Sequence, residues 1–234
     1  FSKGHASPLF FSLWALAGQA QVSTEISPPN PLLHQEGEKF HRAIDPKELM
    51  TLRKFGSRLE GHPTLEFPYT EVPTGSLGQG LPIAVGMALG LRLKGNSAFV
   101  YNSMSDGELD EGSTWEAAMS AAHHGLNNLI CLVDINNQQA DGPSTKVMGF
   151  EPLADKWASF GWHVQRIDAN HLPSVLNAFD TARSLPEAKP RVILCDTLMG
   201  KGVPFLEERE KNHFIRVDPP EWKQALDILD SNRP

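Results

Sequence analysis

The sequence lacks the features that mark several large classes of protein. Its 234 residues contain only two cysteines, Cys131 and Cys195, and both lie in short apolar runs. Because secreted scaffolds depend on many paired cysteines, these two are expected to be buried free thiols, which favours a cytoplasmic location. No apolar run is long enough to span a membrane, so no membrane contact is predicted. No signal peptide is visible, and the chain begins at Phe1 without a methionine.

Positive charge and nucleotide-binding glycine motifs are also scarce. The chain has 21 Lys and Arg against 28 Asp and Glu, for a formal net charge of −7. This balance predicts no nucleic-acid partner. No Gly-x-Gly-x-x-Gly follows the first predicted strand, and no Walker-type Gly-Lys-Ser/Thr occurs. Both absences argue against an unrelated nucleotide-binding domain.

What the sequence does contain is an alternation of short apolar runs with helix-like segments. Strands are predicted at 98–101, 129–133, 162–167 and 191–195, and helices at 81–93, 111–126, 173–184 and 221–230. This alternation predicts an α/β fold, with a mainly parallel sheet covered by helices on both faces. In the helix at 111–126, apolar spacings of three and four place Trp115, Ala118, Met119, Ala122 and Leu126 on one apolar face.

The length is compatible with a single domain over residues 1–234. The segment at about 18–46 contains several prolines and charges, and it is predicted to be an irregular excursion from that domain.

Two polar segments follow neighbouring predicted strands. Asp106-Gly107-Glu108 follows the first strand, and Asp134-Ile135-Asn136 ends the second. In open α/β sheets ligands bind outside the carboxyl ends of the strands, where both segments would lie. Asp106, the Asn136 amide and the main-chain carbonyl of Gln138 offer the oxygen ligands that Mg²⁺ prefers. Either segment alone would be an ordinary turn, but the pair at βαβ spacing predicts a divalent cation that carries a diphosphate.

The stretch that joins these segments resembles the thiamine diphosphate signature of the transketolase family. Its parts appear here as Ser105-Asp106-Gly107-Glu108, Glu111-Gly112, Trp115-Glu116-Ala117, Asn128-Leu129-Ile130 and Asp134-Ile135-Asn136. Ser105 departs from the family's glycine and adds a Cβ where the backbone would approach the diphosphate. Three further segments are similar to family motifs: Ser2-Lys3-Gly4-His5-Ala6, Gly61-His62-Pro63 and the loop from Thr74 to Gly80.

The resemblance implies a role for each matching residue. It implies His5 and His62 as catalytic residues that move protons and contact sugar hydroxyls. It implies Asp106, Asn136 and Gln138 as ligands of Mg²⁺, or of Ca²⁺ or Mn²⁺ in its place. The implied cofactor contacts are His5, Gly75, Ser76, Leu77, Ser105, Gly107, Glu108, Asn136 and His213. Glu111 and Glu116 match acidic residues of the family's subunit interface, although acidic residues early in a helix are equally common without such a role.

The resemblance covers only the diphosphate-binding part of a transketolase. Nothing here corresponds to the family's pyrimidine-binding or C-terminal domains. The family's helical segment before the Ser2 motif is not in this sequence either, so the chain is either a fragment or is given without its start. The simplest interpretation is the N-terminal subunit of a split enzyme, which moves a two-carbon ketol unit from a ketose (phosphate) to an aldose (phosphate) in the pentose phosphate pathway. The implied partner is a C-terminal subunit with a pyrimidine-binding domain, in a homo-dimer of hetero-dimers.

Three other functions remain open at this point. The chain could belong to another thiamine diphosphate enzyme, resembling 1-deoxyxylulose-5-phosphate synthase or a 2-oxoacid dehydrogenase subunit. It could also be a cofactor-binding subunit that does not catalyse. The Ser-Lys-Gly-His and Gly-His-Pro segments favour transketolase over the first two, and intact Asp106 and Asn136 argue against the third.

Overall fold

The computed structural model describes residues 45–67, 70–213 and 216–232. It divides the chain into two compact units, residues 1–77 and 78–234. The excursion predicted at about 18–46 and the segment that carries His5 lie almost entirely outside the described residues.

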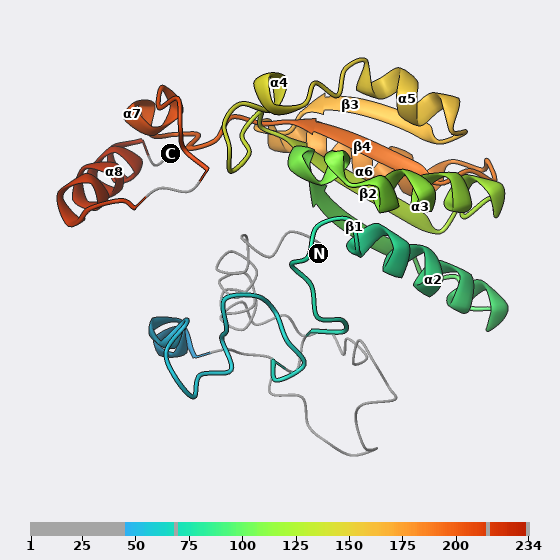
Figure 1. Cartoon of the computed structure of the whole chain (residues 1–234), viewed down its shortest axis with the longest axis horizontal. Helices are drawn as coiled ribbons and strands as arrows, with labels where there is room; N and C mark the ends of the chain where they lie inside the picture. Colours follow the sequence, from blue (N-terminus) through green and yellow to red (C-terminus); the bar gives the residue numbers. More distant parts are fainter. Residues whose placement is uncertain (1–44, 68–69, 214–215, 233–234) are drawn as a thin grey trace. The chain divides into compact units, whose positions relative to one another are not determined.

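The second unit is built on a four-stranded sheet in which every neighbouring pair is parallel (Figure 1). The strands lie in the order β1 (Val100–Ser105), β2 (Leu129–Ile135), β4 (Arg191–Asp196) and β3 (His163–Asp168). Because all four run the same way, their carboxyl ends meet at one edge of the sheet. The predicted α/β class with a parallel sheet is confirmed.

Helices cover both faces of the sheet. One face packs against α2 (Gly80–Leu93), α3 (Gly112–His123) and α5 (Leu153–Ser159), and the opposite face packs against α6 (Leu172–Ser184). In Figure 1, α2 and α3 lie in front of the sheet and α6 lies behind it. The remaining elements of this unit are η3 (Asp106–Asp110), α4 (Ser144–Val147), α7 (Pro204–Glu207) and α8 (Pro219–Ser231).

Small side chains bring α3 close to its neighbours. Its buried residues are Thr114, Ala117, Ala118 and Ala121. Met119, on the predicted apolar face, is 49% exposed. The alanines allow a closer approach of the helices than a methionine would, and the apolar stripe is therefore displaced by about one residue from the one that larger side chains indicate.

The two cysteines are buried and neither forms a disulfide, as predicted. Cys131 on β2 packs with the α2–α3 side of the sheet, and Cys195 on β4 packs with the α6 side. Burial raises the pKa of the Cys131 thiol to about 12. This thiol is therefore protonated at neutral pH and chemically inert.

β1 is longer than its apolar run indicates. The prediction ended this strand at Tyr101, whereas the strand continues through Asn102 to Ser105. Asn102 is buried, and its side-chain amide donates to the Cys131 sulfur over 3.6 Å. The regular parallel pairing with β2 continues to Ser105, opposite Asp134. Pairing with a neighbouring strand therefore outweighs the polar character of these positions.

The first unit has a small described part. A 3-10 helix, η2 (Pro46–Thr51), begins after Asp45, whose carboxylate accepts from the Lys47 amide at 2.9 Å. Leu59 and Phe67 are fully buried.

None of the helices in the described parts of either unit combines the length and apolarity that a membrane crossing requires.

Candidate functional site

Asp106 lies directly after β1 at the carboxyl edge of the sheet and is fully buried. Its carboxylate accepts from the Gly107 amide at 2.9 Å and from the Ser144 hydroxyl at 2.8 Å. Burial raises the pKa of Asp106, and nearby Asp134 adds to the rise, while the Ser144, Gly107 and Asn137 donors lower it. Within the described residues, neither a lysine nor an arginine pairs with Asp106. The protein therefore buries a carboxyl group here among neutral donors.

Asn136 lies just beyond β2 and has a defined orientation. Its side-chain oxygen accepts from the Gln138 amide at 2.9 Å, and its side-chain nitrogen donates to Asp134 at 3.3 Å. Asp134 also accepts a very short hydrogen bond from the Thr197 hydroxyl, which follows β4. The Asx-type turn considered from the sequence is therefore present, and one lone pair of the Asn136 oxygen remains for a further ligand.

Gly107 forms a close contact with Gln139. A Cβ at Gly107 would lie 3.3 Å from Cγ of Gln139, which is tight. The side-chain nitrogen of Gln139 is buried and has no hydrogen-bond partner among the described residues. Ser105, where the family has glycine, has ordinary extended backbone angles of φ −111° and ψ 169°. Its Cβ is therefore accommodated without strain at the end of β1.

Glu108 is fully buried and holds the start of the second unit. Its carboxylate accepts from the Gly78 amide at 3.1 Å, and the Ser113 hydroxyl donates to the Gly78 carbonyl at 2.7 Å. Gly78 has φ +78°, and a Cβ there would lie 2.5 Å from Oγ of Ser113 and 2.7 Å from Cβ of Glu111. Only glycine fits this position. Glu108 therefore fixes the backbone of the glycine-rich loop at Gly78.

In the first unit, His62 and Gly75 are in contact. Gly75 has φ +130°, and a Cβ there would lie 2.6 Å from Nδ1 of His62. The imidazole is exposed, as is the side chain of Ser76, and Leu77 is 36% exposed. Two segments that the sequence singled out separately, Gly61-His62-Pro63 and the loop from Thr74, therefore come together.

His213 lies in a half-buried turn of the second unit. The preceding residue, Asn212, donates to the Leu206 carbonyl at 2.7 Å. Slightly earlier, the Glu210 carbonyl accepts from the Gln138 side chain at 3.2 Å. The segment that leads to His213 is therefore tied to the loop after β2. His5 lies outside the described residues.

Comparison with known proteins identifies the family of the chain. Residues 33–229 match the family model described as "Transketolase, thiamine diphosphate binding domain". The chain belongs to the transketolase family.

Similar proteins support this assignment. The chain is 60% identical over 164 residues to an uncharacterized transketolase family protein of Sinorhizobium fredii, covering 70% of this chain and 59% of that protein. It is 35% identical over 230 residues to the 6-deoxy-6-sulfo-D-fructose transketolase subunit of Clostridium sp. strain MSTE9, covering 98% and 74%. The crystal structure of transketolase from Campylobacter jejuni matches with a TM-score of 0.80 and 27% identity, covering 98% of this chain and 33% of that one. The chain thus spans about a third of that transketolase.

The residues of this transketolase-family chain fit the cofactor that the family implies. Asp106 offers a charged oxygen and Asn136 an amide oxygen at the same sheet edge, and hard divalent cations take such ligands. The buried Gln139 nitrogen offers a donor beside Gly107. Among the described residues, no three His, Cys, Asp or Glu side chains form a metal-binding group. The predicted ligands, Asp106, the Asn136 amide and the Gln138 carbonyl, include only one such side chain. They therefore do not form a group of this kind.

Sequence reasoning missed several of these residues. Ser144 begins the short helix α4, Thr197 and Gln139 lie outside the helices and strands, and none of the three carries a motif of its own. Only their contacts with Asp106, Asp134 and Gly107 connect them to the site.

Glu111 and Glu116 both have exposed side chains. Glu111 is the residue that precedes α3, and Glu116 lies on the outer face of that helix. Their exposure suits either reading of the sequence, so the interface role stays a prediction.

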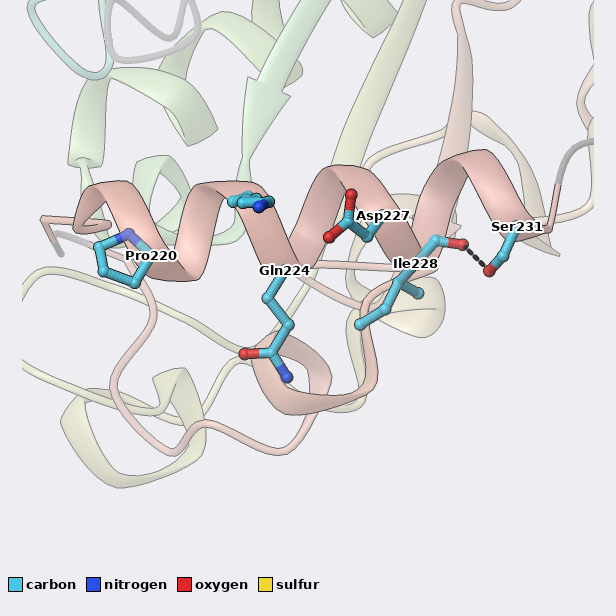
Figure 2. Close-up of a pocket in the computed structure, with 6 residues that line it drawn as sticks. Pro220, Gln224, Asp227, Ile228 and Ser231 are labelled. Carbon is cyan, nitrogen blue, oxygen red and sulfur yellow. Dashed lines mark hydrogen bonds between the residues drawn. The ribbon is translucent and has the colours of Figure 1, made fainter.

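A hollow in the surface lies elsewhere. It has a volume of about 460 Å³, and the described residues that line it all belong to α8, including Pro220, Gln224 and Asp227 (Figure 2). On the same helix the Ser231 hydroxyl donates to the Ile228 carbonyl at 2.8 Å. None of the predicted site residues that the structure describes lines this hollow.

Proposed function

We propose that this chain is the N-terminal subunit of a split transketolase. The observation that carries the proposal is Asp106, a fully buried carboxyl group at the carboxyl edge of a parallel sheet, which accepts only from neutral donors among the described residues. A buried carboxylate is costly unless a cation compensates it. A divalent cation that carries a diphosphate supplies that compensation.

The chain's own residues then have the following roles. Asp106, the Asn136 side chain and the Gln138 carbonyl hold the cation, which is Mg²⁺ or Ca²⁺ or Mn²⁺ in its place. Gly107 and Ser105 allow the diphosphate to approach the end of β1. Bound thiamine diphosphate would supply the nucleophilic carbon that carries a two-carbon ketol unit between sugars.

The remaining residues serve the reacting end of the cofactor and its substrates. His5 and His62 hold and move protons near the sugar hydroxyls. Gly75, Ser76 and Leu77 line the thiazolium ring, and the close approach of Gly75 to His62, a proposed catalytic histidine, supports this assignment. His213 approaches the diphosphate, and Glu108 holds the loop through Gly78.

The partner is a second polypeptide with a pyrimidine-binding domain, and the active assembly is a dimer of such pairs. The similarity over 98% of this chain to a protein named as a transketolase subunit supports this division. Glu111 and Glu116 are placed at the subunit interface by this proposal. The two buried free thiols favour the cytoplasm.

The substrates are a ketose donor and an aldose acceptor. The relative from Clostridium is named for a sulfonated sugar, whereas the sequence resemblance implied sugar phosphates. We propose an anionic ketose as the donor, which includes both, and assign no pathway.

The test is a native purification of the full chain from its source cells, with magnesium and thiamine diphosphate present, followed by mass spectrometry and a ketol-transfer assay. We expect a stoichiometric partner that carries a pyrimidine-binding domain, and transfer by the pair with almost none by the chain alone. Ketol transfer by the purified chain alone would contradict the requirement for a partner. If Asp106→Ala leaves the activity of the assembly unchanged, the chain does not supply the metal site.

A further inference from the structure

Two hydrogen bonds connect Thr197, the residue after β4, to the Asn136 side chain through the Asp134 carboxylate. The Thr197 hydroxyl donates to one oxygen of Asp134, and the Asn136 nitrogen donates to the other at 3.3 Å. The Thr197 amide also donates to the Ile135 carbonyl at 3.1 Å, which extends the pairing of β2 and β4 by one step. Thr197 is thereby held in place by its backbone as well as by its side chain.

These bonds determine which end of the Asn136 amide faces Asp134. An ionised carboxylate only accepts hydrogen bonds, so the nitrogen of Asn136 must face it. On the other side, the Gln138 amide donates to the Asn136 oxygen at 2.9 Å. Rotating the amide by half a turn would bring oxygen against oxygen at Asp134 and nitrogen against nitrogen at Gln138. Both hydrogen bonds would be lost together.

The orientation matters because a cation binds the oxygen of a carboxamide and is repelled by its NH₂ group. We propose that Thr197 and Asp134 are positioning residues that fix the Asn136 amide with its oxygen available to the metal ion. This inference rests on the proposed function, since it assigns the metal to Asn136. It adds a role for two residues that do not themselves bind the ion. Such outer partners orient metal ligands and affect metal affinity strongly.

The two residues have different parts in this arrangement. Asp134 selects the nitrogen end of the amide, and Thr197 occupies the second carboxylate oxygen and so holds the Asp134 carboxylate in place. In Asp134→Asn, the new side chain has one acceptor and one donor group. It can therefore accept from Thr197 while it donates to Asn136, which would favour the reversed amide.

The experiment measures Mn²⁺ binding to the full chain assembled with its proposed partner subunit, with thiamine diphosphate present, by electron paramagnetic resonance of the free ion. Thr197→Val removes the hydroxyl and keeps the shape, so we expect Mn²⁺ affinity to fall about 10- to 100-fold. Thr197→Ser keeps a hydroxyl and should bind Mn²⁺ nearly as tightly as the unchanged chain. Asp134→Asn should weaken binding at least as much as Thr197→Val. The matched control is Thr181→Val on α6, which should leave the affinity unchanged.

Thermal unfolding without metal or cofactor separates positioning from general stability. A residue that only supports the fold would lower the melting temperature without changing Mn²⁺ affinity at a temperature where every variant is folded. Unchanged affinity in folded Thr197→Val would overturn the inference, as would a failure of Thr197→Ser to retain binding. If the unchanged chain does not bind Mn²⁺ with thiamine diphosphate, the proposed function itself is wrong, and that result is distinct from the other two.

Discussion

The carboxyl edge of the sheet has two halves, one at the ends of β1 and β2 (the β1 half) and one at the ends of β4 and β3 (the β3–β4 half). Their acidic side chains have opposite surroundings. At the end of β4, both oxygens of Asp196 accept from the Arg166 guanidinium at 2.9 Å, and Arg166 also donates to Glu151 at 2.8 Å. These groups are partly exposed, and the carboxylates hold the pKa of Arg166 above its usual range. At the end of β1, Asp106 is fully buried and, among the described residues, contacts neutral donors.

The difference distinguishes a structural acid from a candidate ligand. Asp196 is neutralised by the protein's own arginine, so it has no need of an external cation. Asp106 is kept from water without such a partner, and the pKa of its carboxyl group is raised mainly by burial. Burial disfavours the ionised form of the carboxyl group, and a bound cation would stabilise that form. Both halves share the same strand direction, so strand direction alone does not decide where a ligand binds.

The largest expected effect comes from neutralising the two acids in turn. Asp106→Asn keeps the size of the side chain and removes the charged metal ligand, so ketol transfer by the assembled enzyme should fall more than about 100-fold. Asp196→Asn is the matched change at the other half of the edge, and its activity should stay close to that of the unchanged enzyme. The measurement is initial rate at saturating magnesium and thiamine diphosphate. Equal losses from the two variants would remove the distinction between the two halves.

A second effect concerns the close packing that supports the β1 half. Gly78→Ala adds a Cβ that would lie 2.5 Å from Oγ of Ser113, at a backbone angle of φ +78°. We expect the free energy of unfolding to fall by about 2–4 kcal/mol. Gly95→Ala provides the control, because Gly95 has φ +66° and no heavy atom within 4 Å of an added Cβ. Its cost should be about 1 kcal/mol, from the backbone angle alone.

Urea denaturation of four proteins measures both losses of stability. They are the unchanged chain, Gly78→Ala, Gly95→Ala and the variant with both substitutions. The two positions lie apart, so their effects should add. If Gly78→Ala costs no more than Gly95→Ala, the loop at Gly78 is held less tightly than the structure indicates.

The smallest effect is expected from the ion pairs of the β3–β4 half. Arg166→Met keeps most of the apolar stem and removes the charge that pairs with Asp196 and Glu151. Because the Arg166 side chain is 39% exposed, solvent screens these pairs, and the loss of stability should be about 1 kcal/mol or less. Metal binding at the other half should not change. A loss of magnesium affinity in Arg166→Met would show that the two halves are electrostatically coupled.

The sequence predicted the fold well where the pattern was strongly periodic or uniformly apolar. The strands around Leu129–Val133 and Val192–Cys195 and the helix that begins near Leu81 were all located correctly. The extension of β1 through Asn102 was missed, because a polar residue inside a strand is explained only by its neighbour in the next strand. The exposure of Met119 was missed because alanines, rather than the larger side chains, form the contact face of α3.

The candidate site was predicted from its motif residues. The structure adds the residues that form hydrogen bonds with them. Asp106 and Asn136 lie at the same sheet edge, as the βαβ spacing indicated. Ser144 and Thr197 could not be found from the sequence, since each contacts an acidic residue that is distant along the chain. His5 lies outside the described residues, so its role stays a prediction.

Calorimetric titration of the full chain, assembled with its proposed partner subunit, with thiamine diphosphate tests the central claim most directly. The titration would be made with magnesium and again with a chelator, on the unchanged chain and on Asp106→Asn. We predict binding that requires magnesium in the unchanged chain and is lost in Asp106→Asn under both conditions. No binding by the unchanged chain, or equal binding with chelator, or equal binding by Asp106→Asn, would contradict a cation site at the end of β1.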